Sequence, residues 1–233
     1  MKILAIDTST PFLALGIYDE GRSYGIHLET GRKLSSLLTV MIQRALDASG
    51  LKPQEIDYFA CGLGPGSFTG MRTGVAAIKG LAWALKKPVI GLSTFDTLAR
   101  AVISDGRPVV VIVDAKRSLI YSGFYKNRNN CLKRIKPFML LNEKDLLKRI
   151  PSGSILLGDA LNLDSETLVK NIKGVTLLDK EHWAPKAQHL LALVLEKVEE
   201  KKFSSPFDLE PIYLYPKECQ IRTCVITGPR GHK

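Results

Sequence analysis

The first part of the chain alternates short apolar runs with polar turn residues. Residues 3–7, 12–18 and 23–29 are rich in aliphatic and aromatic side chains, and Asp19-Glu20-Gly21 has the composition of a hairpin turn. The pattern predicts three strands that meander, the first of which ends in a polar turn.

Helical spacing then replaces strand spacing. Apolar side chains recur every three or four positions, and Gly50 is placed to end a helix. This apolar set is Leu34, Leu37, Leu38, Met41, Ile42, Ala45 and Leu46. A strand at 56–63, a helix at 71–85, a strand at 89–92 and a helix at 94–103 are expected to follow.

The second half repeats this order loosely. An apolar run at 109–114 ends in aspartate, as the run at 3–7 does, and strands at 119–125 and 131–140 are expected to flank a turn at 127–130. The remaining predicted elements are a helix at 142–149, strands at 155–157 and 175–178, a helix at 165–172 and a long helix that begins near Pro185.

Two halves with one order of elements indicate an internal duplication. We predict an α/β protein with the duplicated actin-like ATPase (ASKHA, ribonuclease H-like) fold, in which each of two lobes holds a mixed sheet flanked by helices. The lobes are expected at residues 1–104 and 105–218, followed by a basic, flexible tail at 219–233.

Composition narrows the class of protein. Hydrophobic residues make up 45% of the 233, which suits a globular core. No apolar run is long enough to span a membrane, and none resembles a secretory signal, so we expect a cytoplasmic protein. The cysteines lack the spacing of a zinc site and are expected to be reduced thiols; they are Cys61, Cys131, Cys219 and Cys224. The net charge of +10 favours nucleic acid or an acidic partner without choosing between them.

The most distinctive stretch runs from Gly62 to Gly74, where five of thirteen residues are glycine. Glycines between a strand and a helix permit a tight turn and the close approach of another backbone, and the amides of a helix N-terminus can hold an anion. The stretch is not a P-loop, because no lysine follows Gly70 directly. It is not a nucleophile elbow either, because Pro65 stands where that turn needs glycine.

Small residues also recur along the helix that follows. Gly70, Gly74, Ala77, Gly80 and Ala84 are spaced by three or four positions. A glycine inside a helix costs roughly 1 kcal/mol relative to alanine, so three of them need a reason. Two interpretations stay open: close packing within the chain's own domain, or binding of a partner by this helix together with the preceding one.

Taken together, these motifs resemble the TsaB family, also called YeaZ. Leu34, Ser36, Ser118 and Leu119 depart from residues common in that family, and the likeness is strongest over the first half. The matching segments are Ile6-Asp7-Thr8-Ser9, Gly64 to Gly74, Lys79-Gly80-Leu81-Ala82, Val113-Asp114-Ala115-Lys116 and Pro211-x-Tyr213-Leu214.

The resemblance implies a non-catalytic subunit in the formation of N6-threonylcarbamoyladenosine at position 37 of tRNAs that read ANN codons. The implied partners are the catalytic relative TsaD, the ATPase subunit TsaE, a second copy of the chain, and tRNA through the complex. Pairing would use the first-lobe helices, at Leu34, Leu37, Leu38, Met41, Gly70, Arg72, Gly74, Ala77, Ile78 and Leu81.

The sequence lacks the metal site of a catalytic relative. The histidines are His27, His182, His189 and His232, and no two of them are four residues apart, which excludes a helical two-histidine site. We therefore expect an accessory subunit without a metal or other cofactor of its own, with the metal in the partner.

Binding of ATP or ADP stays open. Asp7, Thr8, Ser9 and Asp114 occupy the places where actin-like ATPases hold a metal-nucleotide. Both aspartates would serve equally well as Asx residues that close a strand-to-turn junction. The competing function is therefore an actin-like ATPase or kinase, or a peptidase-like hydrolase, that acts on its own.

A third interpretation, a free-standing nucleic-acid-binding module, rests on charge. Lys126, Arg128, Lys133, Arg134 and Lys136 form a basic stretch without acidic residues. Such a stretch can contact tRNA phosphates, or it can be the solvated face of a hairpin.

Overall fold

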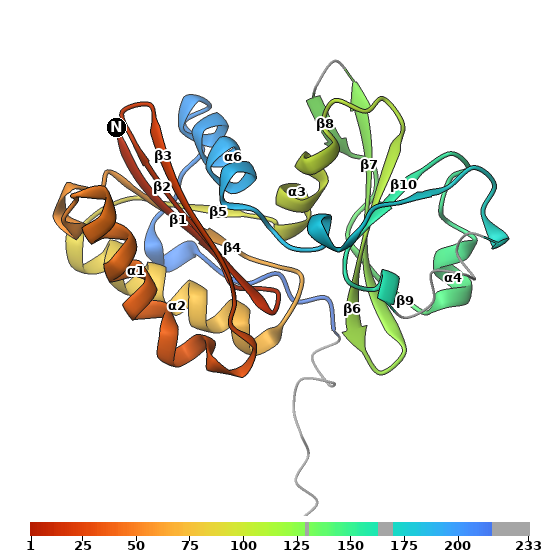
Figure 1. Ribbon diagram of the computed structural model, residues 1–233, viewed down its shortest axis with the longest axis horizontal. Helices are drawn as coiled ribbons and strands as arrows, with labels where there is room; N and C mark the ends of the chain where they lie inside the picture. The colour runs from red at the N-terminus through yellow and green to blue at the C-terminus, as the bar shows by residue number, and fades with distance from the viewer. Residues whose placement is uncertain (129–130, 163–169, 216–233) are drawn as a thin grey trace, which may run out of the picture.

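The computed structural model describes residues 1–128, 131–162 and 170–215, and it forms two lobes, each built on one sheet (Figure 1). The first sheet has the order β3-β2-β1-β4-β5, with β1 (Lys2–Asp7), β2 (Phe12–Asp19), β3 (Arg22–Glu29), β4 (Tyr58–Gly62) and β5 (Val89–Leu92). The second has the order β11-β10-β6-β7-β8, with β6 (Pro108–Lys116), β7 (Leu119–Arg128), β8 (Cys131–Arg134), β10 (Ile155–Leu157) and β11 (Thr176–Leu177); β9 (Met139–Leu141) also pairs with β7.

The two sheets have the same topology. In each, the first three strands of the lobe pair with one another in antiparallel order. Two later strands extend the sheet on the other side of the first strand and run parallel to it. Both sheets are therefore mixed, and the predicted duplicated fold is confirmed.

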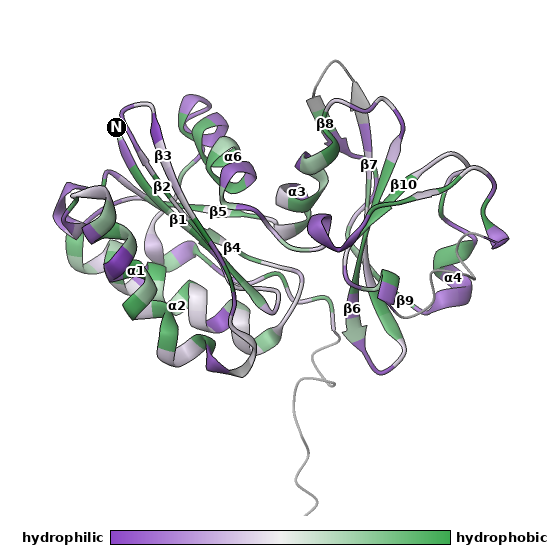
Figure 2. Ribbon diagram, viewed as in Figure 1, coloured by the Kyte–Doolittle hydropathy of each residue, from purple (hydrophilic) through white to green (hydrophobic). Residues whose placement is uncertain are grey.

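Both faces of the first sheet are buried. Because side chains alternate along a strand, Leu4 and Ile6 of β1 face α1 (Leu34–Ser49) and α2 (Phe68–Leu85), whereas Ile3 and Ala5 face α6 (Ala187–Glu199). All four side chains have no exposed surface. Figure 2 shows the resulting hydrophobic colour along the strands of both lobes.

Two helices do not follow the predicted boundary between residues 104 and 105. Helix α3 (Thr94–Ala99), expected in the first lobe, packs with Phe95 and Leu98 against the second sheet. Helix α6, expected in the second lobe, packs against the first sheet. The physical reason is that each helix buries its apolar face on the nearer open sheet, whichever half of the chain that sheet comes from.

The ends of the elements differ in places from the predicted ones. Gly50 ends α1 with a φ of 70°, as expected, and no side chain caps the start of this helix. Helix α2 begins at Phe68, three residues earlier than predicted, because the Ser67 hydroxyl accepts from the Gly70 amide at 3.2 Å. The predicted strand 131–140 is broken into β8 and β9. The second lobe also contains the short helix α4 (Glu143–Leu147).

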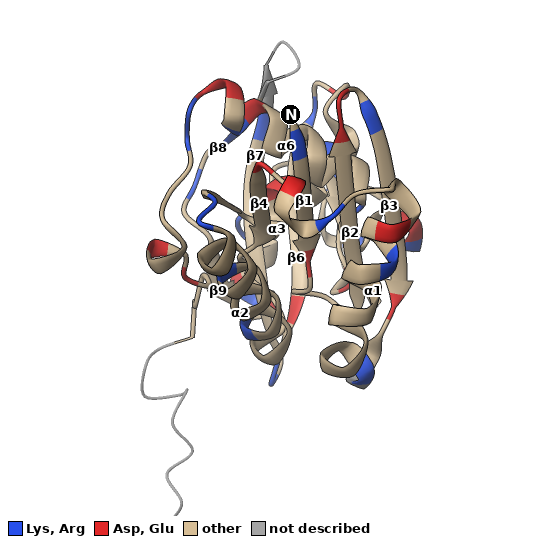
Figure 3. Cartoon of the chain, turned by 90° about the vertical axis from the view of Figure 1, so that its left-hand side faces the viewer, with Lys and Arg blue, Asp and Glu red and all other residues tan. Residues whose placement is uncertain are grey.

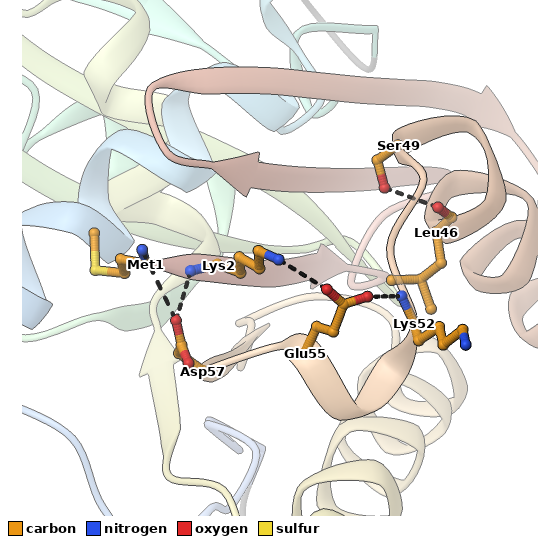
Figure 4. A network of polar contacts seen from close by, with 7 residues as sticks. All are labelled: Met1, Lys2, Leu46, Ser49, Lys52, Glu55 and Asp57. Atoms are coloured by element: carbon orange, nitrogen blue, oxygen red, sulfur yellow. Dashed lines mark hydrogen bonds and ion pairs between the residues drawn. The ribbon is translucent and has the colours of Figure 1, made fainter.

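A polar network fixes the connection from α1 to β4 at one end of the first sheet (Figure 4). Glu55 accepts from the Lys2 ammonium at 2.9 Å and from the Lys52 amide at 2.8 Å, and Asp57 accepts from the Lys2 amide at 2.8 Å. One carboxylate therefore ties the turn Pro53–Glu55 to the first strand.

A strap formed by residues 204–215 leads from α6 back across the first lobe to the second. Ser204 pairs with Val89, and Lys79 of α2 donates to the carbonyls of Phe207 and Leu209. The hydroxyl of Tyr215 then donates to the Ala115 carbonyl of the second lobe at 2.8 Å. The strap thus connects both sheets.

Some predictions fall outside the described residues: the tail 219–233 with Cys219 and Cys224, and most of the helix 165–172. Within the described ranges, no helix combines the length and the apolar character needed to cross a bilayer.

Candidate functional site

A cleft of about 760 Å³ lies between the two lobes. The first lobe contributes residues that follow β1 and the start of α2, and the second contributes residues 113–117 around the end of β6. Tyr213, Leu214 and Tyr215 of the strap complete the wall. The cleft therefore lies where both lobes present the ends of their first strands.

Asp7, at the end of β1, is sealed away from this cleft. Its side chain has no exposed surface. Oδ1 accepts from the Ser9 amide at 2.9 Å and from the Ser9 hydroxyl at 2.6 Å, and Oδ2 accepts from the Thr94 hydroxyl at 2.8 Å. Burial raises the pKa of Asp7, although these three hydrogen bonds oppose the rise.

A count of hydroxyl hydrogens is consistent with the upward direction that burial gives to the pKa of Asp7. Ser9 and Thr94 have one hydroxyl hydrogen each, and an ionised Asp7 receives both of them. The two hydroxyl oxygens also lie 2.7 Å apart, so that contact then has no hydrogen. A proton on Asp7 releases one hydroxyl to bridge it, which favours the neutral acid. The cluster is therefore a structural joint between β1 and α3.

The glycine-rich stretch packs directly over this joint. A Cβ atom on any of four of its glycines would overlap Asp7 or the residues that follow it; these are Gly62, Gly66, Gly70 and Gly74. The obstacle is a backbone carbonyl at two of them, Ser9 for Gly66 and Thr8 for Gly70. In this structure the glycines therefore allow another backbone to approach closely, which is one of the roles considered for them from the sequence.

Asp114, at the end of β6, is placed differently. It lines the cleft, and its side chain forms an ion pair with Lys116, which is 81% exposed. Its own amide donates to Asp159 at 2.8 Å, and burial raises the pKa of Asp159, to which the nearby Asp114 charge adds. Of the four predicted nucleotide-site residues, the cleft is thus lined by Ser9 and Asp114 but not by Asp7 or Thr8.

Donor groups for a metal are not gathered at the cleft or elsewhere in the described ranges. No three His, Cys, Asp or Glu side chains among those residues lie close enough together to hold an ion. Cys61 is buried, and burial raises the pKa of its thiol well above the usual value.

Sequence reasoning missed one partner within the joint and the contacts of one residue in the cleft wall. The sequence places Thr94 at the start of a helix, but no local signal connects it with Asp7, 87 positions away. Tyr213 was noted only within a motif. Its hydroxyl accepts from Arg72 Nε at 3.0 Å, and the Arg72 guanidinium lies 3.9 Å from the centroid of the Phe68 ring. The strap therefore fixes the first turn of α2.

The predicted pairing residues on α1 and α2 divide into buried and outward positions. Six are buried against the first sheet and its following turn: Leu34, Leu38, Met41, Gly70, Gly74 and Ile78. They hold the helices in place and are not available to a partner in this structure. Leu37, Ala77 and Leu81 are half-buried, and Arg72 is exposed.

The outward face of the two helices is formed by three of the predicted residues together with five of their neighbours. We call it the pairing face and define it by Leu37, Val40, Thr73, Ala76, Ala77, Gly80, Leu81 and Ala84, all exposed or half-buried. The two helices carry only four charged residues, and Figure 3 shows their ribbons almost entirely uncharged; the four are Arg44, Asp47, Arg72 and Lys79. Two of these, Arg72 and Lys79, are engaged by the strap.

The small-residue stripe is therefore two stripes. Gly70 and Gly74 face inward, whereas a Cβ atom on Gly80 would meet nothing within 4 Å. Close packing within the chain's own domain, the first interpretation drawn from the sequence, describes Gly70 and Gly74. Binding of a partner, the second interpretation, stays a prediction for the outward positions. The inward glycine Gly74 and the outward residue Thr73 are neighbours in sequence, so the two stripes run side by side along the helix.

The chain is similar to several known proteins. A family model described as "TsaD: tRNA N6-adenosine threonylcarbamoyltransferase" matches residues 25–159. The tRNA threonylcarbamoyladenosine biosynthesis protein TsaB of Bacillus subtilis (strain 168) is 29% identical over 232 residues, which cover 95% of this chain and 97% of that relative. The TsaB protein of Escherichia coli (strain K12) is 28% identical and covers 92% of this chain and 94% of its own length.

A solved structure has the same fold. YeaZ from Pseudomonas aeruginosa superposes with a TM-score of 0.79 at 24% identity, over 91% of this chain and 100% of that one. The family match spans more than half of the sequence, and the TsaB relatives align over almost all of it. The chain therefore belongs to the TsaD family of tRNA N6-adenosine threonylcarbamoyltransferases, and within it to the TsaB (YeaZ) group.

Proposed function

We propose that this chain is the non-catalytic subunit of the complex that forms N6-threonylcarbamoyladenosine at position 37 of tRNAs reading ANN codons. It pairs with a TsaD-type catalytic subunit through the pairing face. The names of the relatives support the pathway. The observation that carries the pairing is an outward run of small side chains on α2, Ala77, Gly80 and Ala84, together with the exposed Val40 on α1.

The physical reason is how closely a neighbouring helix can approach. Small side chains let two helix backbones come near each other. A face without charged side chains can also be covered without removing water from a charge. Val40 is 44% exposed, which leaves an apolar side chain in water unless a partner covers it. A TsaD-type relative has the same fold class, so two such helix pairs would form a four-helix contact.

The same face supports a homodimer. A second copy of the chain would use the identical surface, so self-pairing and pairing with TsaD exclude each other. The ATPase subunit TsaE is the third protein of the proposed complex, and we place the assembly in the cytoplasm. In this proposal the metal belongs to the catalytic subunit, and this chain carries no metal or other cofactor of its own.

The competing function, an ATPase or hydrolase acting alone, is less well supported. Asp7, the first of the two carboxylates that would hold its metal-nucleotide, is buried and accepts three hydrogen bonds from neighbours. ATP hydrolysis by the isolated chain that is lost in the Asp114→Asn variant would favour that function over ours.

The test compares Gly80→Trp and Val40→Glu with the matched controls Gly80→Ala and Val40→Thr. We expect both large substitutions to weaken co-elution with the TsaD-type subunit by roughly 30-fold or more, as for central interface residues. Formation of threonylcarbamoylated tRNA in the reconstituted system should fall with it. The controls should behave like the wild type, since Gly80 faces open space. Normal co-elution of both large variants would refute the proposed pairing.

A further inference from the structure

The positive charge of the chain is concentrated in one part of it. Residues 105–142 carry eight Lys or Arg and two Asp, a net charge of +6 out of the total of +10. From Ala115 to Asn142 there are seven cationic residues and no acidic one. This segment includes the hairpin of β7 and β8 and the turn that follows it.

Three of these lysines lie on one face of the hairpin. Lys126 is directly opposite Lys133 in the strand register, and alternation along β7 places Lys126 on the same side as Phe124. The ammonium of Lys136 lies 5.0 Å from the centroid of the Phe124 ring, which puts it on that side as well. We call Lys126, Lys133 and Lys136 the basic face. All three side chains are exposed.

Within the chain this arrangement is unfavourable. Like charges directly opposite each other on neighbouring strands destabilise a sheet. None of the three lysines forms an ion pair with a carboxylate in the described part of the chain. Arg134 points to the other side of the ribbon, where its guanidinium lies 4.3 Å from the centroid of the Phe138 ring. No carboxylate therefore offsets the repulsion on the basic face in the part of the chain that the structure describes.

The basic face is also remote from the pairing face. The hairpin projects from the second lobe, whereas α1 and α2 cover the far side of the first lobe (Figure 1). A partner seated on α1 and α2 would leave the hairpin open. A surface that must contact a third component of a complex needs this separation.

We propose that the basic face binds the phosphate backbone of RNA and, on the basis of the proposed function, that of the tRNA being modified. Lysine ammonium groups bind phosphates as point charges and read no sequence. Such contacts position a nucleic acid, while the chemistry takes place on another subunit. Repulsion between Lys126 and Lys133 is relieved when phosphates lie between them.

The test measures tRNA binding by fluorescence anisotropy at several salt concentrations. The triple variant Lys126→Gln, Lys133→Gln, Lys136→Gln removes the basic face. Its control, Lys144→Gln, Lys148→Gln, Lys173→Gln, removes three other exposed lysines of the second lobe. We expect the first variant to bind about tenfold or more weakly at moderate salt, with a slope of log K against log salt shallower by about 2 to 3. The control should match the wild type.

Two further measurements separate the possible failures. Co-elution of the wild-type chain with the TsaD-type subunit tests the proposed function alone. If the two proteins do not co-elute, but tRNA binding still depends on the three lysines, only the proposed function is refuted. Equal slopes for the two triple variants would overturn the present inference. So would binding of polyglutamate with the same affinity and the same dependence on the basic face, because the surface would then recognise acidic protein. Thermal unfolding of both variants checks that they fold.

Discussion

The ends of β1 and β6 are equivalent positions in the two sheets, yet their aspartates have opposite environments. Asp7 is fully buried, bonded to Ser9 and Thr94, and covered by glycines. Asp114 lines the cleft and forms an ion pair with the long, solvent-exposed side chain of Lys116. The duplicated topology therefore does not preserve a symmetric site. One strand end has become a structural joint, and only the other faces the cleft.

The burial of Asp7 explains why the stretch from Gly62 to Gly74 is rich in glycine. Its glycines lie over the sealed strand end and belong to the packing of the first lobe. Because the joint also includes Thr94 of α3, it holds the start of α2 against the connection to the second lobe. The most distinctive motif of the sequence thus supports the shape on which the pairing face depends.

The largest effect should come from filling the space over the sealed end. Gly70→Ala would place its Cβ atom against the Thr8 carbonyl, a backbone atom that cannot move aside alone. We expect a loss of about 3 kcal/mol in the free energy of unfolding, measured in urea. The matched change Gly80→Ala, in the same helix but in open space, should stabilise the chain by up to about 1 kcal/mol. Equal effects of the two would contradict the sealed joint.

The next effect separates the two aspartates themselves. Asp7→Asn replaces one carboxylate oxygen by an amide nitrogen, which cannot accept, so at least one of the three hydrogen bonds to Asp7 is lost and we expect a loss of about 2 kcal/mol. Asp114→Asn keeps an acceptor for the Lys116 amide and removes one exposed ion pair, which should cost less than about 1 kcal/mol. Urea unfolding of both variants at neutral pH makes the comparison. A larger loss for Asp114→Asn would reverse our assignment.

The pH dependence sharpens the same comparison. Burial raises the pKa of Asp7 in the folded chain above its ordinary value of 3.8. Between these two pKa values the folded state binds more protons than the unfolded state, so wild-type stability falls as pH rises through this window. Asp7→Asn lacks this titration. The stability difference between wild type and variant should therefore be largest below pH 3.8 and shrink as pH rises. A difference that grows with pH would show that the cluster favours the ionised acid.

Much of the fold could be predicted from the sequence, because alternation and helical spacing report local structure. The meander, Gly50 as a helix end and the aspartates at two strand ends all follow from near neighbours. The helix exchange could not be predicted. Whether α3 and α6 cover their own lobe's sheet or the other depends on which sheet lies nearer, which no local pattern records.

The candidate site was harder to predict for a related reason. The interval between small residues places Gly70 and Gly80 on α2, but it does not say which of them faces the sheet. That choice depends on where Thr8 lies in space. The same limit makes Asp7 and Asp114 look alike in the sequence. The partner that distinguishes Asp7 is Thr94, which is distant along the chain, whereas Asp114 pairs with Lys116 two positions later.

The smallest effect concerns the strap that crosses between the two strand ends. Tyr215→Phe removes a 2.8 Å hydrogen bond to the Ala115 carbonyl, next to Asp114, and should cost about 1 kcal/mol because this hydroxyl is half-buried. Tyr213→Phe removes the acceptor for Arg72 on the exposed side of the first lobe and should cost less than about 0.5 kcal/mol. Urea unfolding of both variants makes the comparison. If Tyr213→Phe proved the more costly, the strap would be anchored chiefly on α2, and the open strand end would owe little of its shape to the strap.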